Sequence, residues 1–260
     1  ITSSIMHMKT PIILVIGGYV NFKRNVMNNY YLKARLYPTI LTMIPLVVLY
    51  IYYLSPSVDT VLSPVWDLLP IFTGVAINVC LMFLLVLLNR FVSKAVFQKL
   101  FYQDDLKMPT TDYLMPDHPL LDNSSRKRYY QYIMIDFNVD MSKELKKLET
   151  ETQKRTMITR IVGQIRTKLR GNKMLLQHNI EYGFFRNLVG GCLIALLTSI
   201  ALLIISICEH NCSIKLTSIV MIVFYLLPII FSKQIITFHG KNYASVLYEQ
   251  YGSLDRRFDK

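Results

Sequence analysis

The sequence has little charge, few cysteines and a single tryptophan. Only 18% of its 260 residues are Asp, Glu, Lys or Arg, whereas 52% are hydrophobic. Soluble domains usually carry about 25% charged residues, so part of this chain is expected to lie in lipid. Four cysteines are too few for a disulfide-linked scaffold, which excludes that class of small secreted protein.

The sequence also lacks the short motifs that carry catalysis. It has no Gly-x-Ser-x-Gly nucleophile turn, no His-Glu-x-x-His zinc motif, no P-loop and no Gly-rich dinucleotide turn. Asp112, Asp117 and His118 offer a metal site or a catalytic pair, but loops are rich in Asp by default, which makes that the weaker interpretation. We therefore predict a protein that is not an enzyme and that uses no cofactor and no metal.

Four apolar runs are present, and none of them contains Asp, Glu, Lys, Arg or His. They cover residues 38–54, 68–88, 188–207 and 216–231, with Pro45 and Pro228 inside the first and the fourth. Their lengths are close to the 17–25 residues or so that cross a bilayer as a helix, and a kink is expected at Pro45. Because charges inside a membrane usually mark ion pathways, their absence argues against a proton-coupled transporter or a voltage sensor.

The basic residues are unevenly distributed around these runs. The chain has 29 Lys and Arg against 17 Asp and Glu. The segment between the first two runs has no Lys or Arg, and the segment between the last two has only Lys215. The positive-inside rule then places both termini and the middle segment in the cytoplasm. We predict an all-α integral membrane protein of the bacterial inner membrane, with four spans in two hairpins and a helical cytoplasmic domain inserted between spans two and three.

This topology divides the chain into five parts. They are a cytoplasmic N-terminal segment (1–37), hairpin one (38–89), a basic helical domain (90–187), hairpin two (188–231) and a cytoplasmic tail (232–260). Residues 1–26 look like an extension, in which 11–20 is a short buried or interfacial segment or the core of a signal peptide.

Helices of the middle domain are predicted from apolar periodicity and from capping residues. The second span continues from Arg90 to Phe101, one helix begins at Arg126 behind Ser124 or Ser125, and a longer one covers 142–169. A last helix runs from about Met174 straight into the third span. Two helical stalks would then join this domain to the membrane.

Three stretches of the sequence, 31–54, 108–131 and 179–188, together resemble a family of uncharacterised bacterial membrane proteins. That family carries a Leu-Pro-Thr-Thr-like motif in the middle loop and an Asn-x-x-Tyr-Gly-Phe-x-Arg-Asn-Leu motif before the third span. Matching residues are Pro109, Thr110, Thr111, Tyr182, Gly183, Phe184, Arg186 and Asn187, and Met108 stands where the family has Leu. The resemblance covers most of the chain after Met27 and implies a multi-pass membrane protein, but no activity.

The strongest candidate site is the motif at residues 182–187, where a helix enters lipid. Its Tyr and Arg residues are either interfacial anchors or part of a hinge or partner contact in which Gly183 supplies freedom. In the second span, Gly74 and Asn78 share one helix face, where Asn78 either bonds to another helix or lines a pore in an oligomer.

Two further candidates lie in the second hairpin. Small residues at steps of four, Gly191, Ala195 and Ser199, favour close helix packing, which is compatible with an oligomer seam. Cys208 and Cys212 flank the outer loop, where they form a disulfide, contribute with His210 to a metal site, or remain unpaired thiols.

Two functions remain open at this point. One is an oligomeric membrane effector, whose cytoplasmic domain senses a signal and whose spans disturb or permeabilise the membrane. Small membrane proteins of this build often serve in bacterial antiphage defence, an expectation that comes from the class and not from these residues. The other is a non-conducting anchor or scaffold for a cytoplasmic partner protein. The basic domain favours retention in the cytoplasm or contact with lipid headgroups, and its many acidic residues make nucleic acid the weaker partner.

Overall fold

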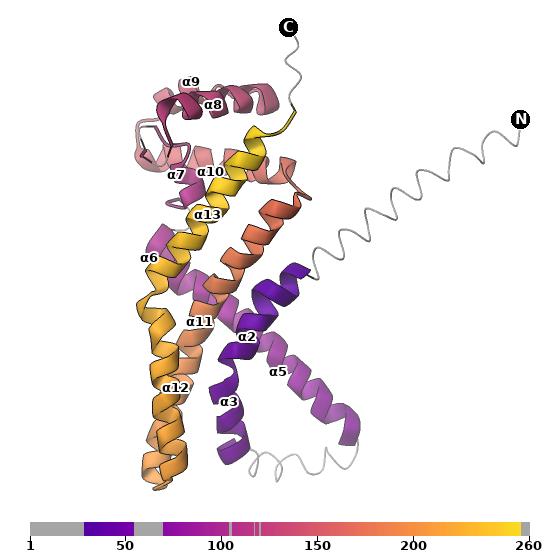
Figure 1. Ribbon diagram of the computed structural model, residues 1–260, viewed down its shortest axis with the longest axis vertical. Coiled ribbons are helices and arrows are strands. Elements are labelled where there is room, and N and C mark those ends of the chain that lie inside the picture. Colours follow the sequence, from indigo (N-terminus) through magenta and orange to yellow (C-terminus); the bar gives the residue numbers. More distant parts are fainter. Residues whose placement is uncertain (1–28, 55–69, 104–105, 117, 120, 256–260) are drawn as a thin grey trace, which may run out of the picture.

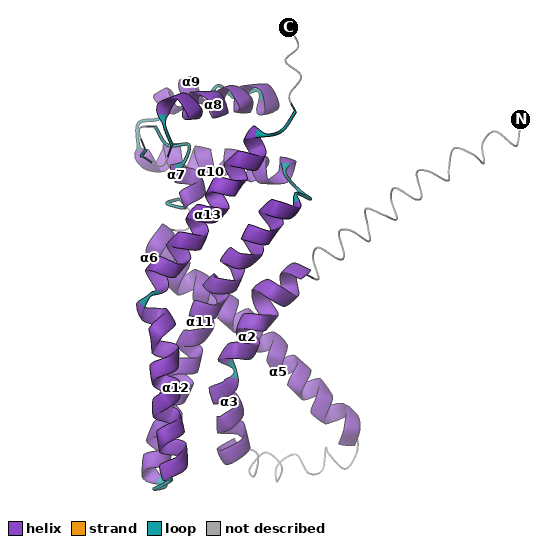
Figure 2. Ribbon diagram, viewed as in Figure 1, coloured by secondary structure: helices purple, strands orange, loops and turns teal. Residues whose placement is uncertain are grey.

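The structure is a computed structural model, and it describes residues 29–54, 70–103, 106–116, 118–119 and 121–255. Of residue 54 and residues 70–78 it describes the helical backbone but not the side chains. Every regular element in these ranges is a helix (Figure 2). The all-α class predicted from the sequence is therefore confirmed for the described part of the chain.

Four elements form the first part of the chain, and a long helix follows them. These are η1 (Leu32–Leu36), α2 (Tyr37–Thr42), α3 (Ile44–Leu49), η2 (Tyr50–Leu54) and α5 (Pro70–Val92), where η marks π-helical segments. Helix α5 runs on without a break through η3 (Ser93–Gln98) and α6 (Lys99–Tyr102). The predicted continuation of the second span beyond Arg90 is thereby confirmed.

Short helices alternate with loops in the middle of the chain, and three long helices end it. The short ones are α7 (Pro109–Asp112), α8 (Asn123–Phe137), α9 (Met141–Lys147) and α10 (Glu151–Lys168). The long ones are α11 (Lys173–Cys208), α12 (Cys212–Ile230) and α13 (Ser232–Gly252). Helix α11 is a single element, as predicted. It extends from the end of the molecule that carries α8, α9 and α10 to the opposite end (Figure 1).

Within the described part of the chain, three helices are long and apolar enough to cross a membrane: Val79–Tyr102, Lys173–Cys208 and Cys212–Ile230. A fourth candidate is broken, because Asn29–Thr42 and Ile44–Tyr53 meet at an angle of 44°. The break lies at Met43, two residues before Pro45, in agreement with the predicted kink. On α12 the large apolar side chains face outward, as lipid contact requires: Leu216, Val220, Val223, Phe224 and Leu227 are exposed.

A core of buried apolar side chains lies at the opposite end of the molecule from the α11–α12 turn. There α8, α9 and α10 lie across the ends of α11 and α13 (Figure 1). We call this part the soluble unit. Its buried apolar side chains come from five helices and from the segments that follow α7 and α10: Leu114, Met115, Tyr129, Ile133, Met141, Leu145, Ile158, Ile161, Val162, Ile165, Leu169, Leu175, Tyr243, Val246, Leu247, Tyr248 and Tyr251.

Two expectations for this part need correction, and a third segment proves to be helical. The helix predicted over 142–169 is two helices, because Thr150 and Gln153 form a reciprocal capping box that starts α10 afresh. The cap of α8 is Asp122 rather than a serine, since its carboxylate accepts the Ser125 N–H at 2.8 Å. Most of the predicted tail, 232–252, is helix α13, which contributes Tyr243 through Tyr251 to the core.

Candidate functional site at the membrane junction

Five polar side chains are buried where α2, the α5–η3 helix and α11 cross. They are Thr39, Thr42, Asn89, Ser93 and Asn187, and none is more than 3% exposed. A buried polar group is costly unless it finds a hydrogen-bond partner, and this is most severe in lipid. The arrangement of these five side chains therefore depends on how they satisfy one another. We call them the junction network.

The asparagines of the junction network connect three helices. Asn89 Nδ2 donates to Thr39 Oγ1 and to Thr42 Oγ1, each at 3.1 Å. The two threonine hydroxyls donate in turn to carbonyls of their own helix, those of Arg35 at 2.9 Å and Pro38 at 3.0 Å. Each threonine is thus both donor and acceptor, which is why a hydroxyl suits this position.

Ser93 extends the junction network to α11. Its Oγ lies 2.9 Å from the Asn89 carbonyl and 3.2 Å from Asn187 Oδ1, and its single proton can serve either acceptor. Asn187 Nδ2 then donates to the Ala34 carbonyl at 2.6 Å. Asn187, a residue of the 182–187 motif, therefore links α11 to the broken helix.

Two carbonyls of the broken helix lack their usual donor because of prolines. In an α-helix the N–H of residue i bonds to the carbonyl of i−4, and proline has no N–H. Pro38 and Pro45 thus leave the carbonyls of Ala34 and Leu41 without that donor. Asn187 of α11 serves the first, and the Tyr225 hydroxyl of α12 serves the second at 2.9 Å. Both neighbouring helices re-satisfy the backbone that proline has freed, as lipid demands.

Glycines let the helix backbones approach closely at this crossing. A Cβ on Gly190 would lie 2.6 Å from the Asn89 carbonyl oxygen and 2.7 Å from the Ser93 backbone nitrogen. A Cβ on Gly191 would lie 2.5 Å from Thr42 Oγ1. Any larger residue at these positions would separate α11 from its neighbours, so the glycines are a condition for the hydrogen bonds described above.

The remaining residues of the 182–187 motif face three different elements. Gly183 packs against Tyr30 and Ala34, both 3.0 Å from the position of a Cβ. Arg186 donates to Gln98 Oε1 at 3.1 Å and lies over the ring of Tyr182. Phe184 is half-buried and meets the ring of Phe185 edge-on. Gly183 and Arg186 of the motif therefore contact other helices.

Tyr182 connects the junction to the soluble unit. It is buried, its ring stacks on Tyr243 of α13 at a centroid distance of 6.4 Å, and its hydroxyl lies 3.8 Å from the Met108 sulfur. Nearby, the Tyr102 hydroxyl at the end of α6 donates to the Ile236 carbonyl of α13 at 3.1 Å. The three long helical stretches are thus joined just outside the apolar spans.

The loop motif at 109–112 forms the short helix α7, and each of its polar residues has a partner. Pro109 is the first helical residue, where a missing N–H costs nothing. The Thr110 carbonyl accepts the Tyr248 hydroxyl at 2.5 Å, and its side chain accepts Arg166 at 3.2 Å. Thr111 Oγ1 lies 3.4 Å from Thr159 Oγ1. The motif holds α13 against α10.

Asp112 completes this docking through an ion pair. Arg155 of α10 donates to Asp112 Oδ1 at 2.6 Å and to Glu151 Oε1 at 2.7 Å, while its NH1 also reaches the Leu106 carbonyl at 3.0 Å. Burial lowers the pKa of Arg155, but the hydrogen bonds and charges of both carboxylates outweigh it and raise the pKa. His118 lies 3.9 Å from Asp112 Oδ2. Asp112 therefore has a structural partner, and Asp117 lies outside the described residues.

The other predicted candidates lie elsewhere. Gly74 and Asn78 fall on α5 where side chains lie outside the described set. Gly191, Ala195 and Ser199 are buried within the chain, so their packing is intramolecular. Cys208 and Cys212 are exposed, unpaired thiols on either side of the α11–α12 turn. Among the residues described, no group of three or more His, Cys, Asp or Glu could hold a metal ion.

Sequence reasoning did not identify Thr39, Thr42, Asn89 or Ser93. All four lie at the ends of predicted apolar runs, where polar residues are expected in any case, so composition gave no reason to group them. A usable signal was present: Thr39 and Thr42 follow Pro38 closely, and Asn89 and Ser93 share one helix face four residues apart.

The fold and the junction network define an all-helical protein with helices suited to crossing a membrane and a helical soluble unit. Comparisons of this chain with protein-family models, with curated proteins and with solved structures find no match. The resemblance noted from the sequence motifs stays a prediction.

Proposed function

We propose that this protein is a regulated membrane effector, in which the soluble unit responds to a cytoplasmic signal and the spans change the permeability of the membrane. The observation that carries the proposal is the continuity of α11 and of α5–η3–α6 from apolar span to soluble unit, with the junction network between them. A displacement of the soluble unit would act directly on that network.

The proposed topology treats the broken helix as a fourth span, with two hairpins and both termini in the cytoplasm of a bacterial inner membrane. In support, the end of α3 and the start of α5 lie toward the same end of the molecule as the α11–α12 turn, opposite the soluble unit (Figure 1). The basic residues of α8, α9 and α10 lie at the soluble end, whereas the α11–α12 hairpin has only Lys215 near its turn. This asymmetry agrees with the positive-inside rule.

The junction network is suited to a two-state role because its bonds are exchangeable. It contains amides and hydroxyls but no ionisable side chain, so it is insensitive to pH and its members can pair with water when the helices separate. Hydrogen bonds between membrane helices contribute only about 0.6 kcal/mol each on average. A modest change in contacts at the soluble unit is therefore enough to shift this crossing.

The experiment compares a buried threonine of the junction network with an exposed threonine outside it. Thr42 and Thr217 each donate to a carbonyl of their own helix, but only Thr42 also accepts a bond from another helix. We would measure membrane potential with a dye in bacteria expressing wild type, Thr42→Val, Asn89→Leu or Thr217→Val, in resting and in phage-challenged cells. Membrane insertion of each variant is verified separately.

We expect Thr42→Val and Asn89→Leu to depolarise resting cells, and Thr217→Val to behave as wild type. The same potential in all four strains, resting and challenged, would refute the effector and leave the anchor that recruits a cytoplasmic partner. The predicted pore residue is tested beside them, because Asn78→Leu abolishes conductance if Asn78 lines the path in an oligomer.

A further inference from the structure

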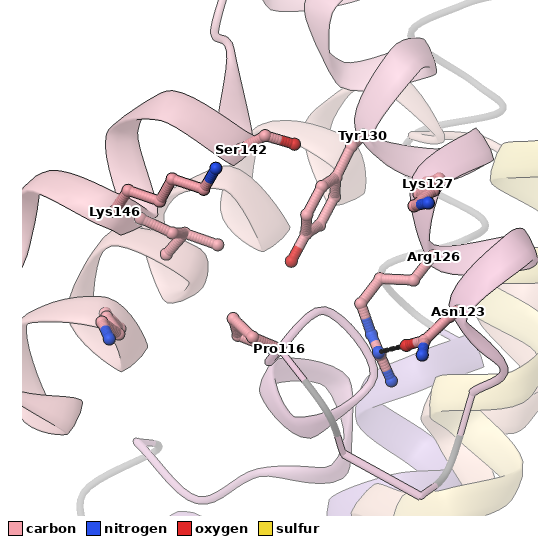
Figure 3. A pocket seen from close by; sticks show the side chains of 9 residues that line it. Pro116, Asn123, Arg126, Lys127, Tyr130, Ser142 and Lys146 are labelled. Carbon is pink, nitrogen blue, oxygen red and sulfur yellow. Dashed lines mark hydrogen bonds between the residues drawn. The ribbon is translucent and has the colours of Figure 1, made fainter.

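The soluble unit contains a basic cavity that the proposed function does not use. The cavity measures about 420 Å³ and lies between α8, α9, α10 and the loop after α7. Its lining includes Arg126, Lys127, Lys146 and Lys154 (Figure 3). This volume falls within the range of about 300–1,000 Å³ typical of small-molecule sites.

The charged side chains among the described lining residues of the cavity are all positive. None of its described lining residues is acidic. Within the described chain, Lys127, Lys146 and Lys154 form no ion pair, whereas Lys143 and Lys147 on the outer side of α9 pair with Asp140 at 3.2 Å and Glu144 at 2.6 Å. Like charges gathered around a concave surface focus a positive potential. An anion placed in the cavity would relieve their repulsion.

Arg126 fixes one wall of the cavity. It is only 4% exposed, and its guanidinium donates to Asn123 Oδ1 at 2.6 Å and to the carbonyls of His118 and Leu121 at 2.5 and 2.6 Å. Its buried Nε has no hydrogen-bond partner. Among the described residues these acceptors are all neutral, and a buried cation is costly without a nearby anion, so an anion bound beside Arg126 would compensate its charge.

The rest of the lining suits an organic anion. The side chain of Tyr130 extends toward the cavity in Figure 3, across from Pro116, and its hydroxyl donates to the Leu114 carbonyl at 2.6 Å. Leu145 adds apolar surface, and the exposed Ser142 hydroxyl is a further hydrogen-bond donor. Several cations beside an aromatic ring and an apolar wall are the features that bind a phosphate group attached to a planar or apolar body.

We propose that this cavity binds a soluble phosphate-bearing metabolite of nucleotide size. A lipid headgroup has the same phosphate chemistry, but α8 and α9 lie at the end of the molecule farthest from the α11–α12 turn (Figure 1). A soluble ligand therefore reaches the cavity more readily than a lipid of the membrane that holds the protein.

A residue that lines the cavity is the sequence neighbour of a residue that holds α7 in place. Lys154 lines it, and the next residue, Arg155, holds Asp112. A ligand bound by Lys154 would therefore act on the Arg155–Asp112 ion pair, which helps to hold α13 against α10. This regulatory part rests on the proposed function, whereas the binding itself does not.

Binding is measured by isothermal titration calorimetry with the full chain purified in detergent, using adenosine diphosphate, pyrophosphate and adenosine as probes. The two phosphate compounds should bind and adenosine should not, with affinity falling as salt rises. Lys127→Gln with Lys146→Gln should weaken binding about tenfold or more, equivalent to one good charge-assisted hydrogen bond. The matched double variant, Lys143→Gln with Lys147→Gln, removes the same charge outside the cavity and should bind as wild type.

The proposal is overturned if neither phosphate compound binds, or if both double variants lose affinity equally, since that indicates a diffuse effect of net charge. Preferential binding to vesicles of anionic phospholipid, lost in the cavity variant, would identify a lipid headgroup as the source and overturn the soluble ligand. Dye release from liposomes containing the protein then separates the two proposals: ligand binding without any change in release refutes the effector and leaves the site intact.

Discussion

The junction network and the soluble unit hold helices together by different means. At the junction, glycines bring backbones together and short polar side chains bond across the crossing, as Gly190 and Asn89 show. In the soluble unit, large rings fill the space between helices, and Tyr248 stacks on Tyr113 at 5.1 Å while its hydroxyl bonds to Thr110. One chain thus uses small residues in one half and tyrosines in the other.

Under the proposed topology, the difference follows from the solvent that surrounds each region. Water drives large apolar surfaces together, so a ring such as Tyr248 or Tyr251 contributes most where the unfolded alternative is hydrated. Lipid tails are as apolar as the side chains, so membrane helices gain from close packing and hydrogen bonds instead. Substitutions in the two regions should therefore fail for different reasons and by different amounts.

The largest effect is expected from Tyr248→Ala in the soluble unit. Tyr248 is 1% exposed, and burial raises its pKa well above the ordinary value. Loss of a buried aromatic side chain costs about 3–5 kcal/mol. Thermal unfolding in detergent micelles, followed by near-ultraviolet circular dichroism, should show a large loss of stability, with α13 released from α10.

Tyr248→Phe is the matched control for that prediction. It keeps the stacked ring and removes only the hydrogen bond to the Thr110 carbonyl, so a cost of about 1 kcal/mol is expected. An equal loss in both variants would mean that the hydrogen bond rather than ring burial dominates, and the contrast between the two regions would then be wrong.

The next largest loss of stability is expected from Gly190→Ala at the junction. The added methyl group would overlap the backbone of α5 and η3. Overpacking of this kind costs about 1–3 kcal/mol. Gly163→Ala is the counterpart in the soluble unit, since nothing lies within 4 Å of its Cβ position and helix propensity should stabilise it by up to about 1 kcal/mol. A lower melting temperature for Gly190→Ala and a higher one for Gly163→Ala would support the comparison. A lower melting temperature for both variants would contradict it.

Much of the fold was accessible from the sequence because it depends on local patterns. The apolar runs and the helix from Met174 into the third run need only periodicity and capping rules. The start of α10 was not predicted, although Thr150 and Gln153 form a local capping box there. The apolar positions continue at helical spacing across this point, which is the pattern of one continuous helix.

The candidate site was less accessible because it depends on tertiary contacts. Asn187 was identified from its motif, but its partner is the Ala34 carbonyl, 153 residues away in the chain. Helix α13 was missed since Tyr243, Leu247 and Tyr251 become a buried face only where α10 and α7 meet them. The sequence reveals which side chains are unusual, whereas only the packing reveals what they hold.

A smaller effect is expected from Tyr225→Phe, which removes the donor to the Leu41 carbonyl that Pro45 leaves unpaired. The cost should be about 0.6 kcal/mol, the average for bonds between membrane helices. In a Pro45→Ala background the restored N–H can serve Leu41, so the cost of Tyr225→Phe should shrink. A double-mutant cycle measures this coupling, and strict additivity of the two changes would show that the proline and the tyrosine act independently.

The smallest effect is a pH dependence at the boundary between the two regions, where His239 of α13 stacks on Phe185 of α11 at a centroid distance of 4.0 Å. Burial lowers the pKa of His239, His178 adds to this, and Glu181 opposes it. Since the unfolded pKa is about 6.5, the unfolded state binds more protons below that value, and the stabilising contribution of His239 is lost as the pH falls toward its lowered pKa. Thermal unfolding at about pH 7.5 and 5.5 should therefore show a decrease for wild type that His239→Phe, which keeps the ring stack, reduces. An identical decrease in both proteins would show that other groups cause the pH dependence and that protonation of His239 does not contribute to it.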